Sequence, residues 1–165
     1  MDTKQLKTVQ APLKARYREA PREALITLEA EGTIGEGLTC SVATARAMVE
    51  AGLHPATGGS GTHACSGDML LQALVACAGV TLNAVATALA IPLQGAKVRA
   101  EGDLDFRGTL GDRDAPVGFR AIRLVFDLEG TISEEQRASL LKLTERYCVV
   151  YQTLKSAPSI AVTMN

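Results

Sequence analysis

Aromatic side chains are scarce in this sequence, and tryptophan is absent. Phe and Tyr together make up 4% of its 165 residues. Proteins that bind single-stranded nucleic acid stack bases on exposed aromatic rings, and this composition offers few such rings. The 17 basic and 18 acidic side chains leave a formal net charge of −1. A basic surface for nucleic acid or for an anionic membrane is therefore not predicted either.

The sequence also lacks the features of a secreted protein. Its first residues, MDTKQLKTVQAPLKARYREAPREAL, contain no apolar stretch of the kind that a signal peptide needs. Its four cysteines, Cys40, Cys65, Cys77 and Cys148, are widely spaced. We therefore expect a cytoplasmic protein whose cysteines serve catalysis or core packing rather than structural disulfides.

One long segment carries no charge, from Met69 to Pro92. It is long enough to cross a bilayer, but alanine dominates it, polar residues interrupt it and no clustered Lys or Arg flanks it. We therefore predict a core helix, with Ser66 as its N-cap and Asp68 in its first turn. Because only one narrow stripe of this helix is small or polar, we expect it to be buried nearly all round. That stripe consists of Gln72, Ala76, Gly79, Asn83 and Thr87.

Alternating apolar and polar residues predict strands on both sides of this helix. They lie at 24–31, within 38–49, and at 97–106, 122–128 and 159–164, with Asp105 on the polar face of its strand. A capping box at Ser133–Gln136 starts a further helix, and a short helical piece ends near Ser156. Strands and helices are segregated, which predicts an α+β fold with mostly antiparallel sheet. We assign residues 1–23 to a partly helical arm and 24–165 to one domain.

Two segments carry a resemblance to a known family. SGDMLLQALVACAG (66–79) and ERYCVVYQTL (145–154) resemble the cysteine motifs of the OsmC/Ohr family, the organic hydroperoxide reductases and their osmotically induced relatives. The match looks closest to a less characterised branch that has an aromatic residue just before the second cysteine. The resemblance implies an intertwined homodimer, in which antiparallel sheets from both subunits wrap two long central helices. We accordingly expect the helix at Met69–Ala90 to lie at the centre of an obligate homodimer.

The same resemblance implies a peroxidase that acts through two cysteines. Cys77 would attack a small organic hydroperoxide and become a sulfenic acid, and Cys148 would then form a disulfide with it. A dithiol reductant, such as a lipoylated protein, would restore both thiols. No cofactor and no metal are implied. The two cysteines are expected to lie close enough to be linked.

A buried thiol needs a nearby cation to ionise, and the family supplies an arginine held by a glutamate. The first predicted turn, GTIGEG, contains no arginine. We assign the role to Arg46, with Arg16 and Arg18 as alternatives. Asp68 lies next to the position of the family's glutamate and would hold the arginine. It is nine residues before Cys77, on the opposite side of the helix, and would not touch the thiol.

Other interpretations of the same residues remain open. Cys65 precedes the helix cap and is an alternative nucleophile for a different transfer reaction, whereas Cys40 fits a plain strand residue. The spacing of His54, His63 and Cys65 matches no standard zinc pattern, so no metal site is predicted, and the glycine-rich loop at 54–63 is assigned to the mouth of the active site. A non-enzymatic member of the fold that binds an apolar small molecule at the dimer interface is the alternative function.

Overall fold

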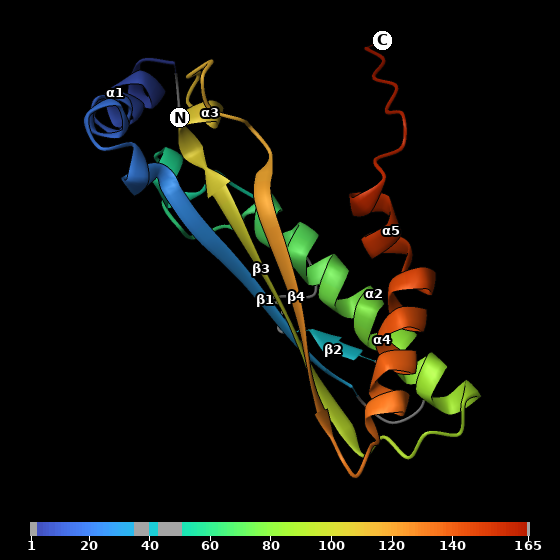
Figure 1. Cartoon of the computed structure of the whole chain (residues 1–165). Helices are drawn as coiled ribbons and strands as arrows, with labels where there is room; N and C mark the ends of the chain where they lie inside the picture. The colour runs from blue at the N-terminus through green and yellow to red at the C-terminus, as the bar shows by residue number, and fades with distance from the viewer. Residues whose placement is uncertain (1–2, 35–39, 43–50, 165) are drawn as a thin grey trace. The chain divides into compact units, whose positions relative to one another are not determined.

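The computed structural model describes residues 3–34, 40–42 and 51–164 (Figure 1). Its elements are α1 (Thr3–Glu19), η1 (Pro21–Ala24), β1 (Leu25–Ile34), β2 (Cys40–Val42), η2 (Pro55–Thr57), α2 (Ser66–Ala88), β3 (Gly95–Asp105), α3 (Phe106–Thr109), β4 (Phe119–Glu129), α4 (Glu134–Tyr147) and α5 (Val149–Lys155). The strands form one sheet in the order β2-β1-β3-β4. β1 and β2 are antiparallel, with Gly32 opposite Val42 and Ile34 opposite Cys40. The predicted α+β class is confirmed.

The chain forms two compact units, each with its own core. The first comprises Met1–Glu31, Ala43–Gln72 and Arg99–Val125, and the second comprises Gly32–Val42, Ala73–Val98 and Phe126–Asn165. The core of the first unit contains Tyr17, Ala24, Phe106 and Leu110. The core of the second unit contains Leu82, Val85, Ala86, Ile91, Ala96, Ile132 and Leu140. The charged arm therefore contributes α1, and through Tyr17 this helix belongs to the first core.

The uncharged segment folds as predicted into a single long helix, α2. Ser66 is its first helical residue rather than the cap before it, and Asp68 lies in its first turn. By length and composition α2 could also cross a membrane, but Leu82, Val85 and Ala86 are packed in the core of the second unit. One face of α2 therefore packs in the core, as expected from its apolar composition.

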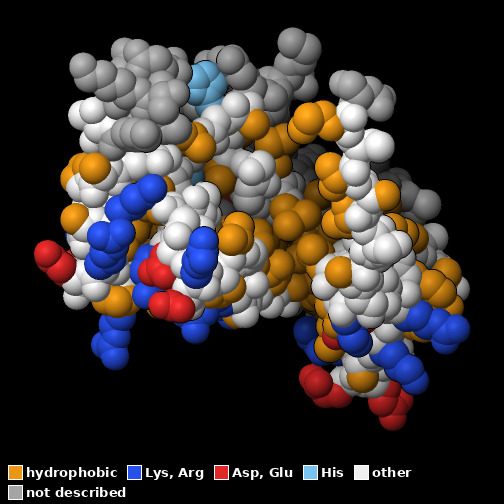
Figure 2. Space-filling view, turned by 90° about the horizontal axis from the view of Figure 1, so that it is seen from above, with side chains coloured by type: hydrophobic (Ala, Val, Ile, Leu, Met, Phe, Trp, Pro, Cys, Tyr) orange, Lys and Arg blue, Asp and Glu red, His pale blue; other side chains and the backbone are white. Residues whose placement is uncertain are grey.

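Burial of α2 on all sides is not found within the chain. Met69, Leu70 and Val80 are each more than a third exposed, and Ala73 between them is exposed as well. The prediction of burial nearly all round was made for a helix between two subunits, so the single chain does not test it. Gly79, expected at a seam with another chain, is buried inside its own. Hydrophobic side chains are open to view on the face shown in Figure 2.

β3 and β4 show the alternation that the sequence predicted, with one exception. Val98 and Ala100 are fully buried, whereas Arg123 of β4 pairs across the polar face with Glu101 and Asp103, at 3.1 Å and 2.6 Å. Asp105 was expected on this polar face, but it is fully buried. It ends β3 and caps α3 by accepting a hydrogen bond from the backbone N–H of Arg107 at 3.1 Å. Its burial is possible because its charge is paired, as described below.

The final strand predicted at 159–164 is wrong, because no strand forms within the described tail. Ile160 and Val162 are 81% and 90% exposed. Alternating apolar residues favour a strand only where a neighbouring strand satisfies their backbone N–H and C=O groups. No described strand of this chain pairs with residues 157–164.

Candidate active site

Cys77 lies in the middle of α2, at the border between its buried and exposed faces. The side chains three residues after and four residues before it, Val80 and Ala73, are exposed, and Cys77 itself is half-buried. In a helix these spacings bring side chains together on one face. The thiol is therefore reachable from the side of α2 that carries exposed apolar groups.

Cys148 lies at the junction between α4 and α5. A capping box fixes the start of α4, where Ser133 and Gln136 exchange hydrogen bonds as predicted. Leu140, Thr144 and Cys148 follow at intervals of four residues and are all buried, so they occupy the inward face. The flanking residues Tyr147 and Val149 are 56% and 71% exposed. Cys148 is thus turned inward by the break between the two helices.

The thiols of Cys77 and Cys148 are neighbours within the second unit, where Leu140 of α4 packs with Leu82 of α2. Both are free thiols. Burial raises the pKa of the Cys148 thiol to about 11, the backbone N–H of Tyr151 opposes this rise, and the adjacent Cys77 thiol adds to it. The hydrogen bond from Tyr151 N–H to Cys148 Sγ is 3.5 Å long. Two neighbouring thiols therefore differ in access to solvent, and the buried one is held protonated at neutral pH.

A buried hydroxyl lies one helical turn before Cys148. The side chain of Thr144 is 1% exposed, and its Oγ1 has no hydrogen-bond partner among the residues that the structure describes. Such an unpaired group costs free energy when it is buried, and its i, i+4 spacing places it on the same helix face as Cys148. The sequence analysis missed Thr144, although the four-residue spacing of Leu140, Thr144 and Cys148 was a usable signal.

The predicted auxiliary residues are not gathered at the thiol pair by any described contact. Arg46 lies outside the described residues. Asp68 is half-buried in the first unit, where burial raises its pKa and the charge of His54 opposes that rise. Burial in turn lowers the pKa of His54, and Asp68 counteracts the shift. Among the alternatives, Arg16 forms an ion pair with Glu23 at 3.2 Å, whereas Arg18 lines a cavity discussed below.

A second feature that the sequence did not predict is an apolar cavity of about 380 Å³ in the first unit. Leu70, Leu104 and Phe119 line it together with His54 and Cys65. The His54 ring stacks on Phe106 with 4.6 Å between ring centroids, and its Nδ1 accepts a hydrogen bond from Ala56 N–H at 3.0 Å. His54 is therefore a fixed, half-buried wall of this cavity. No group of three or more potential metal ligands occurs among the described residues.

The fold and the paired thiols define an α+β protein with a half-exposed and a buried cysteine side by side, one on a long core helix and one between two short helices. The family model of OsmC-like proteins matches residues 59–163, well over half of the chain. The chain therefore belongs to the OsmC-like family, as its cysteine motifs predicted.

Solved structures share this fold. An OsmC-like hydroperoxide resistance protein from Jannaschia sp. CCS1 superposes with a TM-score of 0.60 at 16% identity, covering 83% of this chain and 91% of that one. An OsmC-like protein from Mycoplasma pneumoniae gives a TM-score of 0.56 at 17% identity, covering 81% and 86%. At these identities the likeness concerns the fold alone. No curated protein sequence matches the chain significantly.

Proposed function

We propose that the protein is a thiol peroxidase that reduces small organic hydroperoxides. The observation that carries this proposal is that a half-buried thiol, Cys77, and a fully buried one, Cys148, are neighbours within one unit. A peroxidase that works through a disulfide needs an attacking thiol that the substrate can reach. It also needs a second thiol nearby that is protected from the peroxide until the sulfenic acid has formed. Membership in the OsmC-like family and the name of the Jannaschia relative agree with it.

In the first step the Cys77 thiolate attacks the terminal oxygen of the hydroperoxide. The O–O bond breaks, the alkoxide leaves and takes up a proton to become an alcohol, and Cys77 becomes a sulfenic acid. The sulfur is oxidised by two electrons and the peroxide is reduced by two. The exposed apolar neighbours of Cys77, Ala73 and Val80, would bury part of an alkyl tail, which favours organic substrates over hydrogen peroxide.

In the second step Cys148 attacks the Cys77 sulfur. A disulfide forms and the sulfenic oxygen leaves as water. Cys148 must lose its proton for this attack, and its raised pKa makes this step slow at neutral pH. A dithiol reductant, such as a lipoylated protein, then breaks the disulfide by thiol exchange and takes up the oxidation.

The thiolate of Cys77 needs a positive neighbour, and we propose Arg46 for this role, with Asp68 holding the arginine. We further propose that the protein acts in the cytoplasm as a homodimer, in which a second chain covers the exposed apolar face of α2. The exposure of Met69, Leu70 and Val80 supports the homodimer.

The proposal predicts distinct behaviour for three cysteine variants mixed with cumene hydroperoxide in a stopped-flow experiment. Cys77→Ser should abolish turnover, because it removes the attacking sulfur. Cys148→Ser should complete one oxidation and then stall as a sulfenic acid, detectable by dimedone labelling and intact mass. The matched control is Cys65→Ser, a half-buried thiol in the other unit, which should keep most of the activity.

Wild-type protein should consume cumene hydroperoxide faster than hydrogen peroxide. Full turnover by Cys77→Ser, or the absence of any peroxide reaction in the wild type, would exclude the proposed chemistry.

The apolar cavity of the first unit favours a second candidate function, the binding of an apolar small molecule without catalysis. Its volume of about 380 Å³ and its walls of Leu70, Leu104 and Phe119 fit the usual character of small-molecule sites. Saturable binding of such a molecule by a protein that does not react with peroxides would favour this function over the peroxidase.

A further inference from the structure

A larger cavity, of about 520 Å³, lies in the first unit between α1 and the turn that follows β3. Lys14 and Arg18 line it from α1, Arg107 lines it from α3, and Asp112, Arg113 and Asp114 line it from the turn after α3. The family model begins at residue 59, so the wall formed by α1 is contributed by a segment outside the matched domain. The proposed peroxidase chemistry uses neither this cavity nor, apart from the alternative arginine Arg18, its residues.

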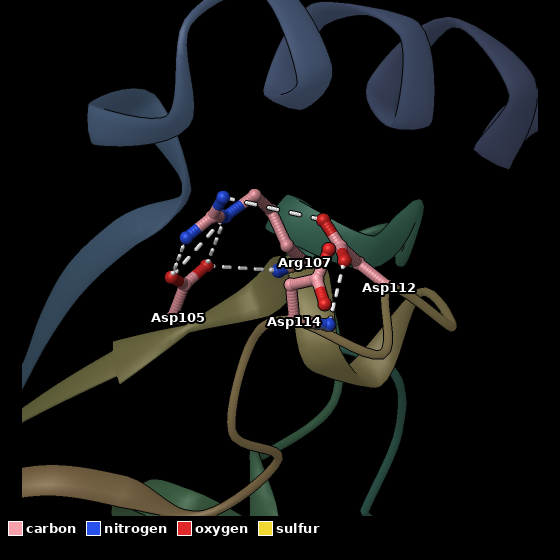
Figure 3. Close-up of polar contacts among 4 residues, drawn as sticks. All are labelled: Asp105, Arg107, Asp112 and Asp114. Carbon is pink, nitrogen blue, oxygen red and sulfur yellow. Dashed lines mark hydrogen bonds and ion pairs between the residues drawn. The ribbon is translucent and has the colours of Figure 1, made fainter.

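One of the four cations, Arg107, is already fully engaged. Its Nη2 and Nε atoms donate to the two carboxylate oxygens of the buried Asp105 at 2.6 Å and 3.1–3.2 Å, and its Nη1 lies 4.0 Å from Asp112 (Figure 3). Asp105 thereby holds the guanidinium in place, and its carboxylate neutralises the positive charge of Arg107. The backbone N–H of Asp114 donates to Asp112 at 3.0 Å and closes the turn. Arg107 and Asp112 therefore form the fixed frame of the cavity.

The other three cations are uncommitted. Lys14, Arg18 and Arg113 are exposed, and none of them forms an ion pair within the part of the chain that the structure describes. One acid, Asp114, remains beside them without a salt bridge there. Counted with Arg107 and its two carboxylate partners, Asp105 and Asp112, the four cations face three carboxylates and leave a net charge of +1. Arginine and lysine clusters of this kind match the charge and geometry of a phosphate group.

Two further residues that line the cavity are buried and less polar. Tyr17 and Leu110 line it and are 1% and 6% exposed, and the Tyr17 hydroxyl donates to the carbonyl of Ala56 at 2.9 Å. The carboxylates of Asp112 and Asp114 add hydrogen-bond acceptors at the rim. A ligand that fills such a site carries an anionic group for the cations and hydroxyl donors for the acids.

We propose that this cavity binds a small phosphate ester that also carries hydroxyl groups, such as a sugar phosphate. The phosphate lies against Lys14, Arg18 and Arg113, and the hydroxyl groups face Asp112 and Asp114. This is a binding site separate from the thiol pair, and it stands whether or not the protein reduces peroxides.

Isothermal titration of the full chain with ribose 5-phosphate and with glycerol 3-phosphate tests the proposal. The double variant Lys14→Gln/Arg113→Gln removes two of the uncommitted cations from the cavity. The matched control, Arg22→Gln/Lys142→Gln, removes two exposed charges that do not line it. Both variants change the net charge equally, so a difference in their affinity for the esters is due to the loss of the cations that line the cavity. Circular dichroism and the melting temperature establish that each variant is folded.

We expect saturable binding of both esters by the wild type, weakened about tenfold or more in the cavity variant because charge-assisted hydrogen bonds are lost. The control should bind within about twofold of the wild type, and unphosphorylated ribose should not bind. In a ¹H–¹⁵N correlation spectrum, ribose 5-phosphate should shift the amides of residues 14–18 and 107–114. Absence of binding, equal weakening in both double variants, or equally tight binding of malate would overturn the proposal.

Discussion

At the scale of single residues, the two thiols of the site differ more in environment than in position. Cys148 is fully buried and its thiol has a pKa of about 11, whereas its neighbour Cys77 is half-buried. Desolvation disfavours a thiolate in the absence of a cation. The division of labour between attacking and resolving cysteine therefore follows from burial, and it determines how the reaction should depend on pH.

The step that forms the disulfide should accelerate as the pH rises. Below its pKa of about 11, Cys148 gains thiolate about tenfold per pH unit, so the decay of the Cys77 sulfenic acid should speed up by roughly a hundredfold between pH 7 and 9. The rise should level off somewhat below pH 11, because a neutral sulfenic acid no longer adds to the pKa of Cys148. Stopped-flow decay of the sulfenic acid after one equivalent of cumene hydroperoxide measures this rate.

The Cys148→Ser variant is the control, since its sulfenic acid should persist at every pH. A rate that is flat from pH 7 to 9 would contradict the assigned order of the two thiols. The measurement from pH 7 to 9 reaches only the start of the pH range in which the fold weakens. The raised pKa of Cys148 stabilises the folded state fully below the pKa of an unfolded thiol, about 8.5, and this contribution is lost as the pH rises to about 11.

The unpaired hydroxyl of Thr144 leads to a prediction about stability. Thr144→Val replaces the buried Oγ1 by a methyl group of similar size and removes a polar atom that has no partner among the described residues. We expect the free energy of unfolding in urea to rise by about 1 kcal/mol. The control is Thr153→Val on exposed α5, which should change it by less than about 0.5 kcal/mol. A Thr144→Val variant that is less stable than the wild type would show that the hydroxyl has a partner in solution.

At the scale of elements, the sequence correctly predicted the helices whose signals lie within their own residues or directly beside them. α2 follows from its length, its apolar face and the proline after it, and α4 follows from the capping box at Ser133. Both features act within a few residues, so no knowledge of the rest of the fold is needed. The roles of Cys77 and Cys148 and their expected proximity came from the resemblance to the family, not from periodicity.

The elements that were mistaken depend on distant parts of the chain. The tail at 159–164 has a strand pattern, yet a strand also needs a neighbour, which local sequence does not reveal. Asp105 has the alternation of a surface residue, but Arg107 two positions later pairs with it and permits its burial. The cavities likewise combine residues far apart in sequence, such as Lys14 and Arg113. A pattern within one segment could not have located them.

At the scale of the whole molecule, the exposed apolar groups lie on elements that the sequence predicted to be covered. α2 exposes Met69, Leu70 and Val80, and the tail exposes Ile160, Val162 and Met164. Large contiguous apolar surfaces on a folded chain mark interfaces. Both observations support the proposed homodimer, in which a second copy covers these apolar groups.

The homodimer makes the last prediction, which concerns Val80. Val80→Lys places a charge in the middle of the exposed face of α2 and should weaken association, because burying an unpaired charge is costly. Sedimentation equilibrium should show the wild type as a dimer and the variant shifted toward monomer. The matched control is Leu141→Lys, which places the same charge at an exposed apolar position of α4 and should leave the dimer intact. A wild-type chain that sediments as a folded monomer at all concentrations would exclude the homodimer, and α2 would then keep its apolar face open to solvent.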